Sequence, residues 1–304
     1  MIKSLEVTNH LGDVLLLELA SPEDSGLCIT DITGIGPGSA NIHTTETATN
    51  DGSMFNSARL SQRNIVITAR LLFKPTVEDV RHKTYKYFPL KQQVKLRFET
   101  DSRICEIYGI VEGNDPVIFE QQEYTQISII CPYPYFYSAG ENGKNVTVFY
   151  GIQPLFEFPF SNESLTEKLI EFGEIMLRAE NLIYYDGDAD VGVEIYITAI
   201  GSAKNITIYN TGTREVMRID TEKMEKITGS GVIAGDQIII STLKGQKSIQ
   251  LLRNGIYTNI LNCLDKNSDW FQLTRGDNVF AYAAEEGATN LQFRVENQTL
   301  YEGV

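Results

Sequence analysis

The sequence is poor in the residues that build most metal, redox and nucleophilic sites. It has four cysteines and three histidines among 304 residues, and the cysteines are widely spaced with no Cys-x-x-Cys pair. This spacing excludes the common zinc and redox motifs. We therefore expect reduced, buried thiols at Cys28, Cys105, Cys131 and Cys263, and neither a metal nor a cofactor.

The strong catalytic motifs are also missing. There is no Gly-x-Ser-x-Gly, His-Glu-x-x-His or Gly-Lys-Ser/Thr sequence,. The glycine-rich segment 34–38 lacks the third-glycine spacing of a dinucleotide site, so we expect a turn or a loop there. These absences favour a protein that is not an enzyme. A hydrolase with dispersed carboxylates stays open as a rival, because paired acids leave no local signature in a β-sandwich.

No apolar run approaches the roughly 20 residues that a membrane-spanning helix needs. The run from Val14 to Leu19 is short, contains Glu18 and lacks a basic lead, so it predicts a buried strand and not a secretion signal,. A formal net charge of −14 would repel phosphate backbones,. We expect no membrane contact and no sequence-specific binding of nucleic acid.

The first half of the chain predicts strands with one helix between them. Strand faces with a period of two are formed by Ile65, Ile67, Ala69, Leu71 and Phe73, by Val94, Leu96 and Phe98, by Ile104 to Tyr108, and by Gln126 to Cys131,. Thr76-x-x-Asp79 is a helix-capping sequence, and apolar residues then recur every three to four positions until Pro89,. One amphipathic helix should therefore pack on the sheet.

A domain boundary is expected near residue 138. Two prolines, Pro132 and Pro134, disrupt strand pairing, and turn residues follow over 138–143,. This predicts domains at 1–138 and 139–304. The second domain reads as short strands with glycine-containing turns, including a meander over Gln237 to Asn259, which indicates a β-sandwich,. The segment Glu163 to Arg178 is ambiguous between helix and strand.

Two features of the second domain have competing interpretations. Asp186, Asp188 and Asp190 could hold calcium, but they lack the glycine and glutamate positions of an EF-hand, so a solvated turn is favoured,. Trp270 and Tyr257 could form an aromatic platform for a saccharide, and core packing is the alternative,.

A basic stretch stands out on this acidic chain and suggests an interface between subunits. It includes Arg81, Lys86 and Arg97, and complementary charge on a neighbouring subunit would fix a head-to-tail register,. A solvated face is the alternative. Tyr135 belongs to an aromatic cluster near the boundary, which either binds a partner or anchors the junction of the two domains,.

The order of these segments resembles the distal tail protein family of siphoviruses. The resemblance rests on the strand Arg63 to Phe73, the helix through Arg81 and Tyr85, the segment Arg97 to Tyr108, and the strand that runs into Cys131-Pro132-Tyr133-Pro134-Tyr135-Phe136. In the second half, Asp269 to Asn278 is similar to a segment that leads into the closing strands of the family's C-terminal domain.

The resemblance implies a mainly β protein, in which an N-terminal sandwich or barrel-like domain with one α-helix precedes a galectin-like C-terminal sandwich. It implies a structural subunit of the virion tail tip, made in the cytoplasm of the bacterial host. Its expected partners are five further copies in a homohexameric ring, the tail tube protein, the tail-tip hub protein, and a receptor-binding protein or a cell-wall saccharide. DNA would pass through the central channel. A separate carbohydrate-binding module is the alternative function.

Overall fold

The computed structural model describes residues 1–46, 51–140, 143–154, 173–177 and 180–304. The chain divides into two compact units, the first formed by Met1–Gly143 with Leu300–Val304 and the second by Lys144–Thr299. The division falls at the end of the turn segment in which the sequence places its boundary. The last five residues belong to the first unit, because Leu300 and Tyr301 pair with the strand Phe136–Ser138. Most of the ambiguous segment Glu163 to Arg178 lies outside the described residues.

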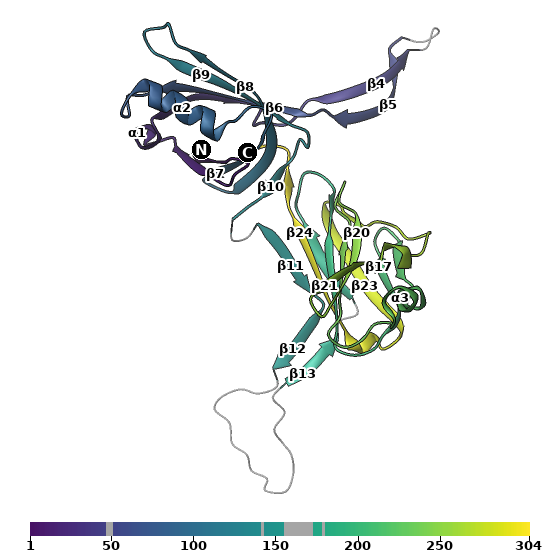
Figure 1. The fold of residues 1–304 in the computed structure, drawn as a ribbon. Helices are drawn as coiled ribbons and strands as arrows, with labels where there is room; N and C mark the ends of the chain where they lie inside the picture. Colours follow the sequence, from purple (N-terminus) through teal and green to yellow (C-terminus); the bar gives the residue numbers. More distant parts are fainter. Residues whose placement is uncertain (47–50, 141–142, 155–172, 178–179) are drawn as a thin grey trace. The chain divides into compact units, whose positions relative to one another are not determined.

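The elements of the first unit are β1 (Ile2–Thr8), β2 (Val14–Glu18), α1 (Pro22–Ser25), β3 (Leu27–Thr33), β4 (Ala40–Glu46), β5 (Ser53–Leu60), β6 (Arg63–Leu71), α2 (Val77–Tyr87), β7 (Gln93–Thr100), β8 (Ile104–Val117), β9 (Tyr124–Cys131), β10 (Phe136–Ser138) and β25 (Leu300–Tyr301). Those of the second are β11 (Lys144–Val148), β12 (Tyr150–Pro154), β13 (Gly173–Leu177), β14 (Glu180–Tyr185), β15 (Val191–Gly192), β16 (Glu194–Ala199), β17 (Lys204–Asn210), β18 (Glu215–Ile219), α3 (Thr221–Thr228), β19 (Gln237–Ser241), β20 (Ser248–Arg253), β21 (Ile256–Asn259), η1 (Leu261–Cys263), β22 (Gln272–Leu273), β23 (Gly276–Glu286), η2 (Ala288–Asn290) and β24 (Leu291–Gln298). The chain is mainly β, as expected (Figure 1).

The first unit is built on one antiparallel sheet in the order β2-β1-β7-β8-β9-β6-β3, and β10 pairs with β8 and β25. Alternate residues of these strands form the core, as the period-two pattern predicts,. The helix α2 covers that core with Val80 and Thr84. Its predicted cap is present, since the Asp79 N–H donates to Thr76 Oγ1 at 3.1 Å,. None of the described helices is both long and apolar enough to cross a bilayer.

Two details of the predicted strands are wrong. The run at Val14 forms an end strand of the sheet and is only half buried, since Leu15 and Leu17 point into the core while Val14 and Leu16 are exposed. A short apolar run does not reveal whether the sheet continues beyond it. Phe73 is 86% exposed, because it lies beyond the end of β6 and Pro75 cannot continue the ladder,.

Buried Arg63 joins three distant segments of the first unit. Its guanidinium donates to the carbonyl of Pro134 at 2.8 Å, of Gly34 at 2.6 Å and of Glu302 at 2.6 Å, and also to that of Gly36. It lies over the Phe136 ring at 4.7 Å. Burial lowers the pKa of this arginine, and the main-chain dipoles solvate its charge,. The glycine-rich loop 34–38 is thus tied to β6 through the carbonyls of Gly34 and Gly36.

The second unit contains two sheets packed as a sandwich, in the orders β11-β24-β16-β19-β20-β21 and β14-β23-β17-β18. Tyr282 on β23 stacks on Phe293 on β24 with ring centroids 3.8 Å apart, which links the two sheets across the core,. The predicted meander is present as β19, β20 and β21. Asn254 and Gly255 both have positive φ in its second turn, as a tight hairpin requires,. The galectin-like detail stays a prediction.

Candidate functional site

Two of the four candidate interface residues, Arg81 and Lys86, lie on α2 and form ion pairs. Arg81 pairs with Glu123 at 3.5 Å and with Glu78 at 3.8 Å, and its side chain is only 17% exposed. Lys86 pairs with Asp13 at 3.0 Å, and the hydrogen bond between them raises the pKa of Lys86 and lowers that of Asp13. Both basic groups therefore have partners within their own unit.

Arg97 lies on another surface of the first unit, the outward face of the sheet. Across the strands it stands opposite Glu6 on β1 and Glu106 on β8, and Glu106 in turn is opposite Tyr137 on β10. Arg97 therefore belongs to a row of alternating charges that ends at an aromatic residue. Because α2 packs on the core side of the sheet, Arg97 does not share a face with Arg81 and Lys86.

Tyr135 belongs to a tyrosine cluster, defined here as Tyr108, Tyr133, Tyr135 and Tyr137. Tyr133 lies 5.4 Å from Tyr135 and stacks on Tyr137 at 5.6 Å, while Tyr108 meets Tyr137 edge-on at 6.3 Å. Burial and the neighbouring Glu106 carboxylate raise the pKa of Tyr108 to about 12. The structure thus groups Tyr135 with Tyr137, which stands opposite Glu106, a strand neighbour of Arg97.

The two candidate saccharide contacts are in different local settings. Tyr257 lies on β21 and is 62% exposed. Trp270 is partly buried next to β22, and Lys247 Nζ lies 5.2 Å from its ring. Phe271, the next residue, is the one that enters the core. Trp270 itself is therefore not part of the core.

Asp186, Asp188 and Asp190 lie in the loop between β14 and β15. Within the described ranges, no group of three or more histidine, cysteine, aspartate or glutamate side chains converges as a metal site. All four cysteines are free thiols, three buried and Cys28 partly so. Burial raises the pKa of Cys105 to about 11 and of Cys131 to about 12, which disfavours the thiolate form of both,.

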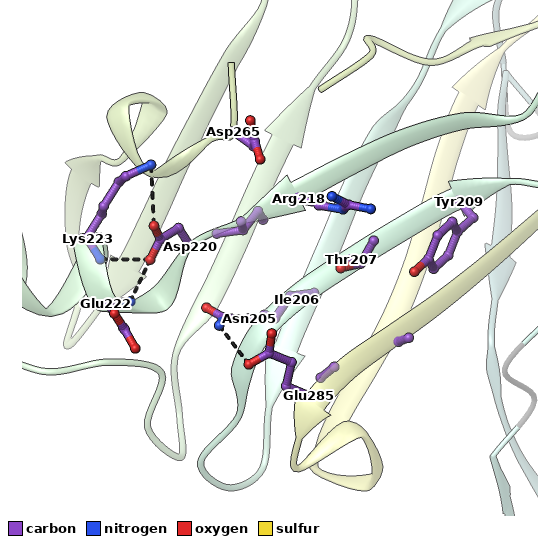
Figure 2. A pocket seen from close by; sticks show the side chains of 13 residues that line it. Asn205, Ile206, Thr207, Tyr209, Arg218, Asp220, Glu222, Lys223, Asp265 and Glu285 are labelled. Atoms are coloured by element: carbon purple, nitrogen blue, oxygen red, sulfur yellow. Dashed lines mark hydrogen bonds and ion pairs between the residues drawn. The ribbon is translucent and has the colours of Figure 1, made fainter. Parts of the chain in front are cut away.

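A groove of about 520 Å³ on the second unit was not predicted from the sequence. It lies on the outer face of β17, β18 and β23 beside α3 (Figure 2), and its charged lining residues include Arg218, Lys223, Asp265 and Glu285. The Asn205 amide donates to Glu285 at 2.8 Å. A groove of this size, with mixed hydrogen-bonding groups, can hold a small polar ligand.

A second groove, of about 540 Å³, adjoins the first, and Tyr209 lines both. On the sheet it stands opposite Ala281 on one side and Val216 on the other, while its neighbour Thr207 faces Ala283. The small alanines leave room beside the phenol. The resulting surface, called here the Tyr209 groove, combines an aromatic ring with hydrogen-bonding groups on either side.

The groove is fixed at one end by the start of α3. Asp220 caps this helix by accepting from the N–H groups of Glu222 and Lys223, both at 3.0 Å. These bonds, led by the one from the Lys223 backbone, lower the pKa of Asp220. The Asp-Thr-x-Lys sequence at 220–223 is a recognisable capping signal, but it gives no indication of the groove beside it.

Comparison with protein families decides what kind of domain this sandwich is. Residues 186–296 match the family model described as the C-terminal domain of siphovirus-type tail components. The second unit is therefore similar to the C-terminal domain of siphovirus-type tail components. This match confirms the family resemblance of the sequence over residues 186–296. No curated protein matches the sequence.

Solved structures extend the likeness to both units. The Dit protein (gp 19.1) of phage SPP1, described as a paradigm of the hub adsorption apparatus in phages that infect Gram-positive bacteria, has a TM-score of 0.66 and 12% identity, over 97% of this chain and 98% of that one. At that identity, the likeness establishes the fold. Chains of the phage P2 baseplate in its activated conformation with calcium and with strontium match at TM-scores of 0.49 and 0.47, each at 9% identity, covering 98% and 97% of both chains.

Proposed function

We propose that this protein is a hub subunit of the tail tip, which assembles through its first unit into a hexameric ring between the tail tube and the host-adsorption apparatus. The observation that carries the proposal is the tail-component domain in the second unit, joined to a first unit that shares the fold of the SPP1 hub protein. The proposed role is structural, and it assigns no catalytic residue to the chain.

Features of the first unit are consistent with self-assembly. Its outward sheet face has alternating charges at Glu6, Arg97 and Glu106, next to the tyrosine cluster. Charged rows of this kind set register between subunits, and tyrosines are enriched in interfaces. A closed ring needs two different faces on each subunit, so a single patch would not suffice. The partners in this role are further copies, the tube protein and the tail-tip hub protein.

Negative-stain imaging of the purified full chain tests the ring. The expected result is a six-fold symmetric particle with a central channel, formed without any other tail protein. Open filaments would contradict ring closure, and dispersed monomers at high protein concentration would contradict self-assembly. Addition of purified tube protein should cap one face of the particle.

Saccharide binding is the second candidate function, and the Tyr209 groove is what favours it. A tyrosine flanked by alanines and by hydrogen-bonding side chains suits a sugar ring, whose apolar face stacks on aromatic residues,. Its acidic lining disfavours anionic polymers,. The sequence-predicted contacts, Tyr257 and Trp270, do not line this groove.

Calorimetric titration with fragments of neutral cell-wall polysaccharide tests this second function. Binding by the wild type that is lost in Tyr209→Ala and kept in Tyr257→Ala would support the Tyr209 groove. Binding lost only in Tyr257→Ala would move the site to β21. An absence of heat with every fragment would leave the tail hub as the sole function.

A further inference from the structure

The strands β4 and β5 form an arm that is exposed on all sides. They pair only with each other among the described strands, and every described residue from Ala40 to Arg59 is exposed. Figure 1 shows the arm leaving the sheet of the first unit. Ile42, Met54 and Phe55 are 63%, 62% and 64% exposed. An isolated two-stranded hairpin is at best marginally stable in water, so an arm with three exposed apolar side chains is typical of a segment that docks on a partner.

The base of the arm is held firmly, which suits a docking element. Arg63 binds the carbonyls of Gly34 and Gly36 just before β4, and the Ser61 N–H donates to the Ser39 carbonyl at 3.0 Å across the base. Gly34 has a φ of +78°, and a Cβ there would lie 2.0 Å from the Asn64 carbonyl oxygen. Only glycine fits this close approach. The arm therefore leaves the sheet in a fixed direction.

A matching acceptor exists on the same unit. The strand β2 ends the main sheet, so one of its edges has unpaired backbone groups, and Val14 and Leu16 on its outer face are 52% and 47% exposed. At the other end of the sheet, β3 exposes polar residues, including Asp31 and Thr33. An end strand with apolar residues on both faces is an aggregation hazard unless another strand covers it. Of the two open edges, β2 is the one suited to an apolar arm.

Charge favours a second copy as the occupant. Two chains of net charge −14 repel each other, so they must meet through segments of low charge,. The described parts of the arm carry little charge, with Glu46 and Asp51 as acidic residues and Arg59 as the basic one. Arg59 on the arm and Glu18 on β2 are exposed, have opposite charge, and take part in none of the ion pairs of the described residues. Arm and edge are thus complementary in hydrophobicity and in charge.

We propose that the arm of one copy adds as a strand to the open edge of β2 on the next copy, so that Ile42 and Phe55, which share one face of the arm, cover Val14 and Leu16,. Main-chain hydrogen bonds supply the attachment, and the apolar side chains fix the register. Donor and acceptor are different surfaces of one unit, so the contact repeats head to tail. This inference rests on the proposed ring and names the contact that closes it.

Disulfide formation between two differently labelled pools tests the contact directly. On a Cys28→Ser background, one pool carries Phe55→Cys on the arm and the other carries Leu16→Cys on β2. We expect a disulfide-linked dimer in the oxidised mixture and in neither pool alone. The matched control acceptor is Val146→Cys on β11, whose native side chain is 53% exposed, and we expect no link to it. Equal linking to both acceptors, or none to Leu16→Cys, overturns the proposal.

Association measurements separate this proposal from the ring itself. The variant Ile42→Ser/Met54→Ser/Phe55→Ser changes only exposed side chains, and it should associate at least about tenfold more weakly in light scattering upon dilution. Arg59→Glu should weaken association by roughly two- to fivefold, and adding Glu18→Arg should restore it. A triple-serine variant that assembles like the wild type would overturn the arm contact and leave the ring standing. A wild type that is monomeric at every concentration would overturn both.

Discussion

The two units of this protein differ in how the chain builds them. The second unit is one continuous segment, whereas the first is closed by five residues that arrive after the second unit is complete. Each unit also uses an arginine differently. Arg63 binds only main-chain carbonyls, one of them 239 positions away, while Arg253 binds the carboxylate of Asp236 within its own neighbourhood. The comparison teaches that the first unit needs a segment that follows the second unit in the chain, whereas the second unit is closed within one continuous segment.

Removal of Leu300–Val304 should have the largest effect and should destabilise the first unit selectively. Fully buried Leu300, the pairing of β25 with β10, and the bond from Arg63 to Glu302 would all be lost. We expect a loss of about 4–6 kcal/mol in the free energy of unfolding. Hydrogen exchange should show faster exchange in β8 and β10 and unchanged protection in β16 and β19. Loss of protection in the second unit instead would break the comparison.

Arg63→Met should lower the free energy of unfolding of the first unit by about 3–5 kcal/mol, because four main-chain carbonyls lose the hydrogen bonds that the buried Arg63 side chain donates,. Differential scanning calorimetry should show one transition at lower temperature and the other unchanged. Arg70→Met is the matched control, since Arg70 is an exposed residue of the same strand, and it should shift neither transition. Equal melting temperatures of the two variants would show that the hydrogen bonds from Arg63 to the four carbonyls do not stabilise the first unit.

In the second unit, the counterpart of Arg63→Met is a change to the ion pair of Arg253 and Asp236. Asp236→Asn should weaken the pair with Arg253, whose Nη2 lies 2.6 Å from a carboxylate oxygen that is buried. The expected loss is about 2–3 kcal/mol, reduced from that of a fully buried pair because Arg253 keeps some contact with solvent. Only the transition of the second unit should move. A shift in both transitions would mean that the units do not unfold independently.

Asp220→Ala should cost about 1 kcal/mol in the second unit, since it removes the cap of α3,. Because the pKa of Asp220 is lowered from 3.8, its contribution is fully present above about pH 4 and is lost as the pH falls through the lowered value,. In urea unfolding at neutral pH, the variant should therefore have a lower free energy of unfolding than the wild type. The two values should become equal in strong acid. A constant difference at all pH values would exclude the charged cap.

The sequence predicted those parts of the fold that periodicity and capping encode. The strands β6 to β9, the helix α2 with its Thr76 cap, and the meander of the second unit follow from local patterns,. The arm was not predicted, because its strands show no alternation between buried and exposed residues. The pairing of Leu300 with β10 and the hydrogen bonds of Arg63 to four carbonyls join residues far apart in the chain. No local sequence pattern predicts such contacts.

The candidate site was harder to predict than the fold. From the sequence, the basic stretch was interpreted as one surface. In the structure, α2 and β7 place Arg81 and Arg97 on opposite sides of a sheet. The Tyr209 groove depends on Ala281 and Ala283, which leave space only because β23 lies next to β17. Strand order across a sheet is not written in the sequence of any single strand.

The mass of the purified full chain, measured by light scattering over a range of concentrations, tests the central claim most directly. Assembly through the first unit predicts a particle of six times the 34.1 kDa chain mass. The triple-serine arm variant should shift that mass toward the single chain, with the melting of the second unit unchanged. A wild type that stays at 34.1 kDa at every concentration would contradict the account of the first unit as an assembly element.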